Sequence, residues 1–220
     1  MNKIIVVGAS DQSRCTIDVI EQQKAFEVYG VLDKNLPKGE FFAGYKILGY
    51  LEVLEELLEN REIYGGIVAV GDNFTRRKIV KEILSLYHDF QFVNAIHPSV
   101  IIGKNVKIGS GSLLMPGVIL NNNSGVGDHC ILLTRSSLDH DSTMGDFSSL
   151  SPGVTTGGRV SIGKCSAIGI GANILHCRSI GDHCVIGGGA LINKNVDDSS
   201  VAYGVPARIV KKRKKSEKYL

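Results

Sequence analysis

The chain has 220 residues, of which 43% are hydrophobic, enough apolar material for a packed core in one or two domains. Its mean hydropathy is +0.08 and no run approaches about 18 apolar residues, so we expect no membrane span. The net charge is +3, but residues 208–220 alone carry 7 − 1 = +6. Residues 1–207 therefore carry 3 − 6 = −3, and this negative charge argues against a fold that binds nucleic acid.

The first ninety or so residues alternate between strand-like and helix-like segments. Short apolar runs predict strands at 3–7, 27–32 and 66–70, and amphipathic runs predict helices at about 10–21, 51–58 and 75–86. This order predicts a small parallel sheet with helical crossovers. Ligands of such sheets bind beyond the carboxyl ends of the strands, where residues 8–13, 33 and 71–73 would converge.

The turn after the first strand carries only a weak phosphate-binding signature. A dinucleotide fingerprint needs three glycines, and only Gly8 is present, so we do not expect a redox nicotinamide cofactor. The free amides of the following helix could still bind a phosphate or a hydroxyl-rich ligand, with Ser10 and Ser13 as hydroxyl donors. Plain helix capping by these serines is the alternative.

A strict period of six residues occupies the second half of the chain. In steps of six from Ile102 to Ile192, every position is aliphatic (Met144 included) except Thr156. A period of six is typical of a chain that turns a corner every six residues. Each short strand then points one aliphatic side chain inward, and the Gly or Asn that follows adopts the unfavourable backbone conformation of the turn. Three corners close an 18-residue coil, so this stretch predicts a parallel β-helix.

These patterns divide the chain into three parts: an α/β domain at 1–93, the β-helix at 94–198, and a C-terminal segment with the basic tail at 199–220. The tail could attract phosphates of a small ligand or could be a solvated terminus. The N-terminus has no secretory signal, and the five cysteines contain no C-x-x-C pair, so we expect a reduced, cytoplasmic protein. Cys130, Cys165 and Cys177 lie within coils, where we expect small buried thiols.

His140 is the leading candidate for chemistry on the β-helix. It lies two residues after Leu138, one of the inward positions, and between Asp139 and Asp141. An imidazole is the usual general base near neutral pH, and a neighbouring carboxylate can fix its tautomer. A surface histidine with no chemical role is the alternative. Triangular prisms pack side by side into trimers, and we expect the base to face the cleft between two of them.

Histidines also recur at whole numbers of coils. His140 and His176 are 36 residues apart, and His129 and His183 are 54 apart, so each pair should lie on one side of the prism. Stacked histidines resemble the zinc site of the γ-type carbonic anhydrases, a family with this class of β-helix, and the resemblance implies a third histidine about five residues after His176, where this chain has Gly181. Two imidazoles without a third ligand do not make a catalytic zinc site, so we expect no metal.

The segments IHPSVIIG, DHD, GDFSSLSPGV and YGVPARIV, together with a Rossmann-like N-terminal domain, resemble the bacterial sugar O-acyltransferases of the sialic acid O-acetyltransferase type. The resemblance covers nearly the whole chain. That group includes the N-acetyltransferases of UDP-4-amino-4,6-dideoxy sugars and of GDP-perosamine. It implies a left-handed hexapeptide β-helix and a homotrimer, in which acetyl-CoA is the co-substrate, lies in the groove between two β-helices, and reacts without a metal.

The resemblance also implies roles for particular residues. His140 corresponds to the catalytic base and Asp141 to the acid that orients it. The acetyl-CoA contacts correspond to Ser149, Gly158, Ile170, Gly188, Arg208 and Lys211, with the Gly158 amide at the thioester carbonyl. The contacts to the sugar nucleotide correspond to Gly8, Ser10, Gln12, Ser13, Asp33 and Asn73.

Three positions depart from the family pattern: Ser10-Asp11-Gln12 replaces Gly-Gly-His, Ser149 replaces a histidine, and Leu133 replaces an asparagine. The expected reaction is N-acetylation of a nucleotide-linked 4-amino-dideoxy sugar, a UDP-amino sugar, for surface glycan biosynthesis. O-acetylation of sialic acid or a related sugar needs the same base and is one alternative. A non-catalytic role in binding or scaffolding is the other.

Overall fold

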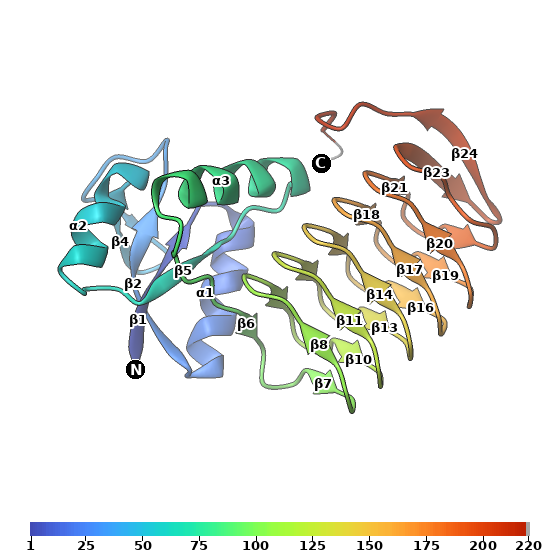
Figure 1. Ribbon diagram of the computed structural model, residues 1–220, viewed down its shortest axis with the longest axis horizontal. Helices are drawn as coiled ribbons and strands as arrows, with labels where there is room; N and C mark the ends of the chain where they lie inside the picture. The colour runs from blue at the N-terminus through green and yellow to red at the C-terminus, as the bar shows by residue number, and fades with distance from the viewer. Residues whose placement is uncertain (219–220) are drawn as a thin grey trace.

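The computed structural model describes residues 1–218 and shows an α/β domain beside a prism of stacked coils (Figure 1). The N-terminal domain has one five-stranded sheet in the order β3-β4-β2-β1-β5, parallel except for β3 against β4. Its strands are Asn2–Val7 (β1), Phe26–Leu32 (β2), Phe41–Phe42 (β3), Tyr45–Gly49 (β4) and Gly65–Val68 (β5). Its helices are Asp11–Gln23 (α1), Leu54–Glu59 (α2) and Asn73–Leu86 (α3), and a 3-10 turn at Leu51–Val53 precedes α2.

Helices cover both faces of this sheet because successive side chains of a strand point to opposite faces. Ile4 of β1 packs in a cluster with Ile17 of α1. Its neighbour Ile5 packs on the other face with Leu54 of α2 and Val80 of α3. All four side chains are at most 3% exposed. The predicted small parallel sheet with helices is therefore confirmed.

The short hairpin β3–β4 was not predicted from the sequence. Its strands are antiparallel and are joined by Ala43 and Gly44, which have φ of 50° and 85°. Two positive φ angles are what a two-residue hairpin turn requires. An Ala-Gly pair is a weak signal for such a turn, since alanine rarely takes this conformation.

The second half of the chain forms three flat sheets around a common core. The first sheet contains β7 (Ile101–Ile102), β10 (Ile119–Leu120), β13 (Ser137–Leu138), β16 (Thr155–Thr156), β19 (Asn173–Ile174) and β22 (Leu191–Ile192). The second contains β8 (Lys107–Ile108), β11 (Gly125–Val126), β14 (Thr143–Met144), β17 (Ser161–Ile162) and β20 (Ser179–Ile180). The third contains β6 (Ala95–Ile96), β9 (Leu113–Leu114), β12 (Ile131–Leu132), β15 (Ser149–Leu150), β18 (Ala167–Ile168), β21 (Val185–Ile186), β23 (Ser200–Gly204) and β24 (Ala207–Lys212).

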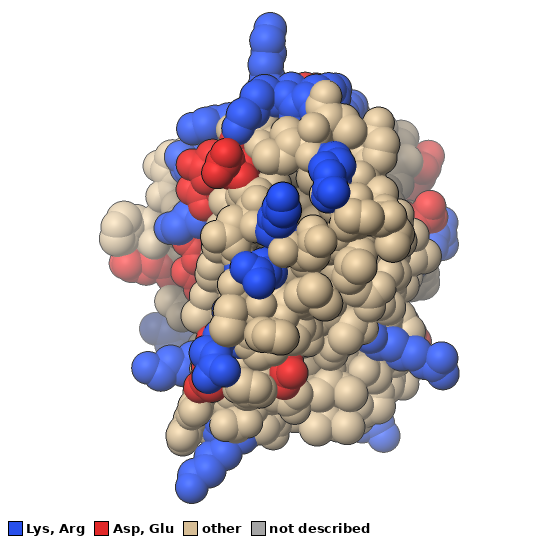
Figure 2. All heavy atoms as spheres, turned by 90° about the vertical axis from the view of Figure 1, so that its right-hand side faces the viewer, with Lys and Arg blue, Asp and Glu red and all other residues tan. Residues whose placement is uncertain are grey.

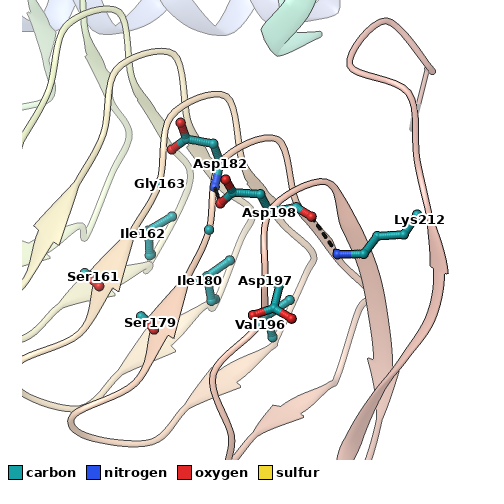
Figure 3. A pocket seen from close by; sticks show the side chains of 11 residues that line it. Ser161, Ile162, Gly163, Ser179, Ile180, Asp182, Val196, Asp197, Asp198 and Lys212 are labelled. Carbon is teal, nitrogen blue, oxygen red and sulfur yellow. Dashed lines mark hydrogen bonds between the residues drawn. The ribbon is translucent and has the colours of Figure 1, made fainter.

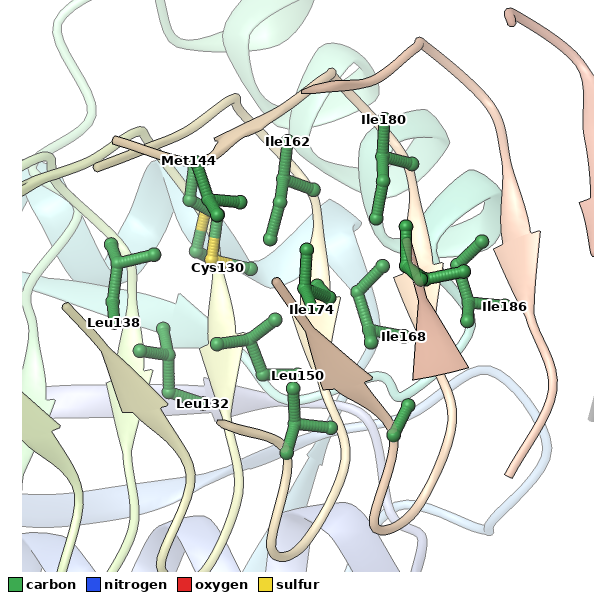
Figure 4. Packing of buried hydrophobic residues seen from close by; sticks show 14 of the residues in the cluster. Cys130, Leu132, Leu138, Met144, Leu150, Ile162, Ile168, Ile174, Ile180 and Ile186 are labelled. Atoms are coloured by element: carbon green, nitrogen blue, oxygen red, sulfur yellow. The ribbon is translucent and has the colours of Figure 1, made fainter. Parts of the chain in front are cut away.

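The coils up to β22 are 18 residues long, because a strand pairs with the strand 18 residues later, as Leu120 pairs with Leu138. The last coil is shorter, since Val185 pairs with Val201, 16 residues later. The predicted left-handed parallel β-helix is confirmed. Figure 4 shows the inward side chains stacked in columns, and those from Leu114 to Ile192 are at most 5% exposed. Ile102, in the first coil, is 48% exposed. Burial of each such side chain contributes about 1.5–3 kcal/mol, so the columns are the main source of stability.

The glycines that follow the inward residues have a different role from the one predicted. Positive φ occurs three residues after the inward residue, as at Asp141 (φ 55°), and not at these glycines. A Cβ on Gly109 would lie 2.6 Å from the carbonyl carbon of Gly127, and one on Gly163 would lie 2.5 Å from that of Gly181. At these glycines the next coil therefore passes too close for a side chain.

The turns between strands form three ridges along the prism. We call residues 121–124, 139–142, 157–160 and 175–178 the His140 ridge. Residues 127–130, 145–148, 163–166 and 181–184 form the docking ridge, and residues 133–136, 151–154, 169–172 and 187–190 form the Ile170 ridge. Whether a cysteine is buried depends on the ridge on which it lies. Cys165 is buried on the docking ridge, as predicted, but the prediction is wrong for Cys177, which is exposed on the His140 ridge.

The N-terminal domain packs on the docking ridge and on the third sheet. Leu113 and Ile131, which point outward from that sheet, are buried in the cluster that contains Ile17 of α1. Arg76 of α3 is 0% exposed and donates from Nε to the His129 carbonyl (2.9 Å) and from Nη2 to the Phe147 carbonyl (3.0 Å). This buried guanidinium joins the two parts of the chain.

The C-terminal hairpin was also not predicted. Strand β23 continues the third sheet in parallel with β21, and β24 folds back antiparallel to β23. Beyond it, the buried Arg213 donates from Nη1 to the His183 carbonyl (3.0 Å), which ties the basic tail to the docking ridge. Figure 2 shows Lys and Arg side chains gathered along the upper edge of this end of the molecule. Over residues 1–218, no helix has the length and apolar character needed to cross a bilayer.

Candidate active site

His140 and Asp141 form a hydrogen-bonded pair on the His140 ridge, in the turn from β13 to β14. The distance from His140 Nδ1 to Asp141 Oδ2 is 2.8 Å, and the two side chains are 42% and 44% exposed. Asp141 has φ of 55°, a conformation that aspartate tolerates better than most residues. The hydrogen bond from His140 is the main reason that the pKa of Asp141 lies below its usual value. The carboxylate is therefore ionised where it can orient the imidazole.

Side chains of the preceding coil hold this turn in place. Asn123 donates from Nδ2 to Asp141 Oδ1 (3.1 Å), so both carboxylate oxygens are engaged. Asn121 donates from Nδ2 to Asp139 Oδ1 (2.6 Å), and the same oxygen accepts the His140 amide (2.7 Å). The main chain and the ring of His140 are thus fixed by contacts within the β-helix.

Gly158 lies directly against the free edge of the imidazole, one coil further along. A Cβ on Gly158 would lie 2.3 Å from His140 Nε2, so only glycine leaves room for the ring. Among residues 1–218, no atom accepts a hydrogen bond from the Gly158 amide. An unpaired amide beside the nitrogen of a general base is the arrangement that an oxyanion donor requires.

The other histidines do not add to this site. His129 lies on the docking ridge, 4% exposed, between Phe92 and Phe147 at ring-centroid distances of 4.6 and 5.0 Å. Burial lowers its pKa to about 4. In the part of the chain that the structure describes, no group of three or more His, Cys, Asp or Glu residues is placed to hold a metal ion.

The residues assigned to acetyl-CoA are spread over several parts of the prism. Ile170 and Gly188 are neighbours on the Ile170 ridge, where a Cβ on Gly188 would lie 3.1 Å from Ile170 Cγ2. Ile170 is 63% exposed. Arg208 and Lys211 lie on β24, and Lys211 forms an ion pair with Glu217. Gly158 is the one of this set that lies beside His140.

Ser149 is not placed for the role predicted by resemblance. It points outward from the third sheet, which is opposite the His140 ridge in a three-sided coil, and it is 9% exposed. Its Oγ accepts a hydrogen bond from Asn73 Nδ2 (3.2 Å). Within one chain, Ser149 therefore belongs to the interface between the N-terminal domain and the β-helix.

Asn73 likewise differs from the prediction that it binds a sugar nucleotide. Its side chain is 1% exposed and also donates to the Ser166 carbonyl, 3.2 Å away. Ser13 is 0% exposed, and its Oγ donates to the Ala69 carbonyl and accepts from the Ser10 amide. For Ser13 the alternative, helix capping, is confirmed, because Ser10 and Ser13 form the capping box of α1.

A cavity of about 290 Å³ lies beyond the carboxyl ends of β1 and β2, where the sequence predicted a ligand site. Gly8, Asp33, Tyr50, Lys78 and Glu82 are among the residues that line it. The Asp33 carboxylate accepts the main-chain amides of residues 9, 35 and 36, so it fixes the loops around the cavity. Ser10 is exposed and Gln12 half-buried in the first turn of α1.

A larger hollow of about 640 Å³ lies on the second sheet near the C-terminal end (Figure 3). Its lining includes Asp182 and Asp198, whose Oδ1 atoms accept main-chain amides of the neighbouring coil. Lys212 Nζ donates to the Asp198 carbonyl across 2.9 Å. These polar groups cap turns, and the hollow contains no histidine or cysteine.

The fold thus brings His140, Asp141 and Gly158 together, whereas the predicted nucleotide site lies in the N-terminal domain. Every hydrogen bond described for residues 139–141 goes to another residue of the β-helix. The N-terminal cavity belongs to the domain that packs on the docking ridge and the third sheet. Within a single chain, the His140 pair and the N-terminal cavity are therefore separate.

A family model described as the PglD N-terminal domain matches residues 3–83. The structure is similar over its whole length to a variant of GDP-perosamine N-acetyltransferase from Caulobacter crescentus in complex with CoA and GDP-perosamine. That match has a TM-score of 0.90 and 29% identity, and covers 96% of this chain and 98% of the other.

Two further solved structures are similar to the same extent. The acetyltransferase domain of PglB from Neisseria gonorrhoeae, in complex with acetyl coenzyme A, matches with a TM-score of 0.86 and 27% identity over 95% of this chain and 99% of the other. WeeI from Acinetobacter baumannii matches with a TM-score of 0.84 and 27% identity over 94% and 100%. The resemblance expected from the sequence is confirmed, and the matches support an acyltransferase.

Proposed function

We propose that this protein transfers the acetyl group of acetyl-CoA to the amine of a nucleotide-linked 4-amino-dideoxy sugar, with His140 as general base. The observation that carries the proposal is the 2.8 Å bond between His140 and Asp141, half-exposed, with the free Gly158 amide beside the ring. Two of the solved neighbours support the same class of reaction, since they are acetyltransferases that hold CoA or acetyl-CoA.

The proposed reaction is direct transfer without an acyl-enzyme. The acceptor amine attacks the thioester carbonyl carbon while His140 Nε2 takes the amine proton. The Gly158 amide donates to the oxyanion that forms, and Asp141 stabilises the imidazolium. The carbon–sulfur bond then breaks, and the proton held by His140 passes to the departing CoA thiolate. The products are the N-acetyl sugar and free CoA, with the imidazole neutral again.

A homotrimer would join two half-sites, the His140 pair and the N-terminal cavity. We propose that residues 94–198 of two copies form the groove for acetyl-CoA, and that residues 1–93 of one copy bring the sugar nucleotide to His140 of another. Exposed apolar side chains support contact along these edges: Ile170 is 63% exposed on the Ile170 ridge, and Leu175 is 42% exposed on the His140 ridge. Ile170 and Gly188 would then meet the pantetheine arm, and Arg208 and Lys211 the CoA phosphates.

Gly8, Ser10, Gln12 and Asp33 would surround the nucleotide at the N-terminal cavity. The neighbour that binds GDP-perosamine supports a nucleotide-linked amino sugar as the acceptor class. A UDP-linked acceptor is our specific proposal. Release of CoA thiol, measured with UDP-, GDP- and dTDP-linked amino sugars against CMP-sialic and free sialic acids, tests it. Turnover with the sialic acids alone would contradict N-acetylation and favour O-acetylation.

Removal of the proposed base gives the first test of the mechanism. General-base catalysis contributes about 10²–10⁴-fold, so His140→Ala should lower kcat by about two to four decades. The side chain is half-exposed, so the fold and the melting temperature should be unchanged. Steady-state kinetics with acetyl-CoA check the prediction, and near-normal turnover in the folded variant would remove His140 from this role.

A further inference from the structure

Thr156 is the exception among the inward side chains, and it lies one coil beyond the turn that holds His140. It is 3% exposed, as buried as the aliphatic residues at the equivalent positions. A buried hydroxyl costs free energy unless it is hydrogen-bonded, so a threonine in this column needs a partner. The partner is the main-chain amide of Asp139, which donates to Thr156 Oγ1 across 2.9 Å.

This bond replaces a bond between main-chain atoms. One coil earlier, the Asn121 amide donates to the Leu138 carbonyl (3.0 Å), and one coil later the Gly157 amide donates to the Ile174 carbonyl (2.8 Å). The amide of Asp139 occupies the equivalent position between them and donates to the threonine hydroxyl instead. At this position the turn that carries His140 is therefore held by a side-chain hydroxyl, whereas the equivalent turns of the two neighbouring coils are held by main-chain carbonyls.

The strand pairing changes at the same place. Strands β13 and β16 pair only through Ser137 and Thr155. Among the described strands of this sheet, the other neighbouring pairs all pair through both of their residues. The 18-residue register is kept, but the main-chain ladder is thus interrupted next to the turn that carries His140.

Asp139 connects this irregular backbone to the imidazole. Its Oδ1 accepts the amide of His140 (2.7 Å) and Nδ2 of Asn121 (2.6 Å), while its own amide is held by Thr156. Three hydrogen bonds therefore fix Asp139, the residue that directly precedes His140. A shift of its amide would move the His140 backbone with it.

We propose that Thr156 is a positioning residue: its hydroxyl holds the Asp139 amide away from the regular ladder, and this places the His140 imidazole between Asp141 and Gly158. The proposal rests on the proposed function of His140 as general base. A displacement of about 1 Å in a catalytic group can cost about 10²-fold in rate, so the hydroxyl would affect kcat although it touches no substrate.

Thr156→Val tests the proposal because it keeps the shape and removes the hydroxyl. We expect kcat to fall about 10- to 100-fold, with the KM for acetyl-CoA within about twofold and the melting temperature unchanged or higher. Thr156→Ser, which keeps the hydroxyl, should keep most of kcat. Ile174→Val, at the equivalent position one coil later, is the matched control and should keep wild-type kcat. Wild-type kcat in a folded Thr156→Val would overturn the proposal.

Should Thr156→Val unfold, Thr156→Ser and Thr156→Ala provide the comparison, since both lack the methyl group and differ in the hydroxyl. The serine variant must then have the higher kcat, and equal values overturn the proposal. The ¹⁵N shifts of the His140 ring report its tautomer without any substrate. They should change in Thr156→Ala and not in Thr156→Ser. If the wild type acetylates no acceptor, the proposed function fails, and these shifts still decide the role of Thr156.

Discussion

The lack of a side chain at Gly158 shapes the candidate site as much as the imidazole of His140 does. The Nε2 edge of His140 can lie against the next coil because Gly158 has no Cβ, and the same glycine offers an amide that no other described atom uses. Asp141 reaches the ring because its backbone adopts φ of 55° at the third residue after the inward position. The geometry of the pair therefore follows from where the corner of the coil falls.

Gly158→Ala should separate activity from folding. The new Cβ would lie 2.3 Å from His140 Nε2, so the ring must turn away, and we expect kcat to fall by about 10²-fold or more. Gly125→Ala is the control, because its Cβ would meet only Thr143 Cγ2 at 3.8 Å. Kinetics and circular dichroism on both variants check this, and an active Gly158→Ala would contradict a close contact between ring and glycine.

The period of six and the His-Asp pair could be read from the sequence because both are local in the chain. The burial of Ser149 and Asn73 could not, since it arises where α3 meets the third sheet, between residues 76 positions apart. The buried position two residues before each inward residue, at the end of the turn, was also missed except at Cys130: small residues such as Val118 and Ala172 fill it, and they share size and burial rather than chemical type.

Among the elements, α3 decides how the two parts of the chain are joined. Asn73 and Arg76 in its first turn are buried, and the guanidinium of Arg76 donates to carbonyls of residues 70 and 71 in the domain and of residues 129 and 147 in the β-helix. A buried charge with all its donors directed at carbonyl oxygens is strongly oriented. Arg76 therefore orients the junction between domain and prism, beside the apolar packing of Leu113 and Ile131 against Ile17.

Arg76→Met should loosen this junction. The methionine fills part of the space but leaves buried carbonyls without donors, so we expect the free energy of unfolding to fall by about 2–4 kcal/mol. Lys81→Met, on the exposed side of the same helix, should change it by less than about 0.5 kcal/mol. Urea unfolding of the two variants measures the difference. Equal stabilities would show that Arg76 is not the main link.

For the molecule as a whole, the separation of the half-sites is the main constraint on the proposed function. The nucleotide cavity opens beside β1 and β2, whereas His140 lies on a ridge that makes no described hydrogen bond to the N-terminal domain. In the proposed function, another copy brings the sugar from its cavity to this ridge. Assembly is therefore part of the proposed catalysis.

Leu175→Asp tests the assembly. A charge on the His140 ridge would be buried against a neighbouring copy, so we expect a monomer in sedimentation velocity, with acetyl transfer lost and the melting transition still cooperative. Phe41→Asp is the control: Phe41 is 72% exposed on the N-terminal domain, and its change should leave a trimer. A wild-type protein that sediments as a monomer would contradict the trimer directly.

The uniform coil gives this molecule a fixed length scale. Each coil advances the chain by one strand spacing, about 4.8 Å, and residue 194 lies three coils past His140, about 14 Å along the axis, next to the strand that carries Arg208. In the proposed complex, the span from His140 to residue 194 sets the distance between the thioester of acetyl-CoA and the phosphates of the same molecule. In that complex, one more 18-residue coil between His140 and Arg208 would lengthen the span by about 4.8 Å, so we expect it to favour a donor with a longer arm.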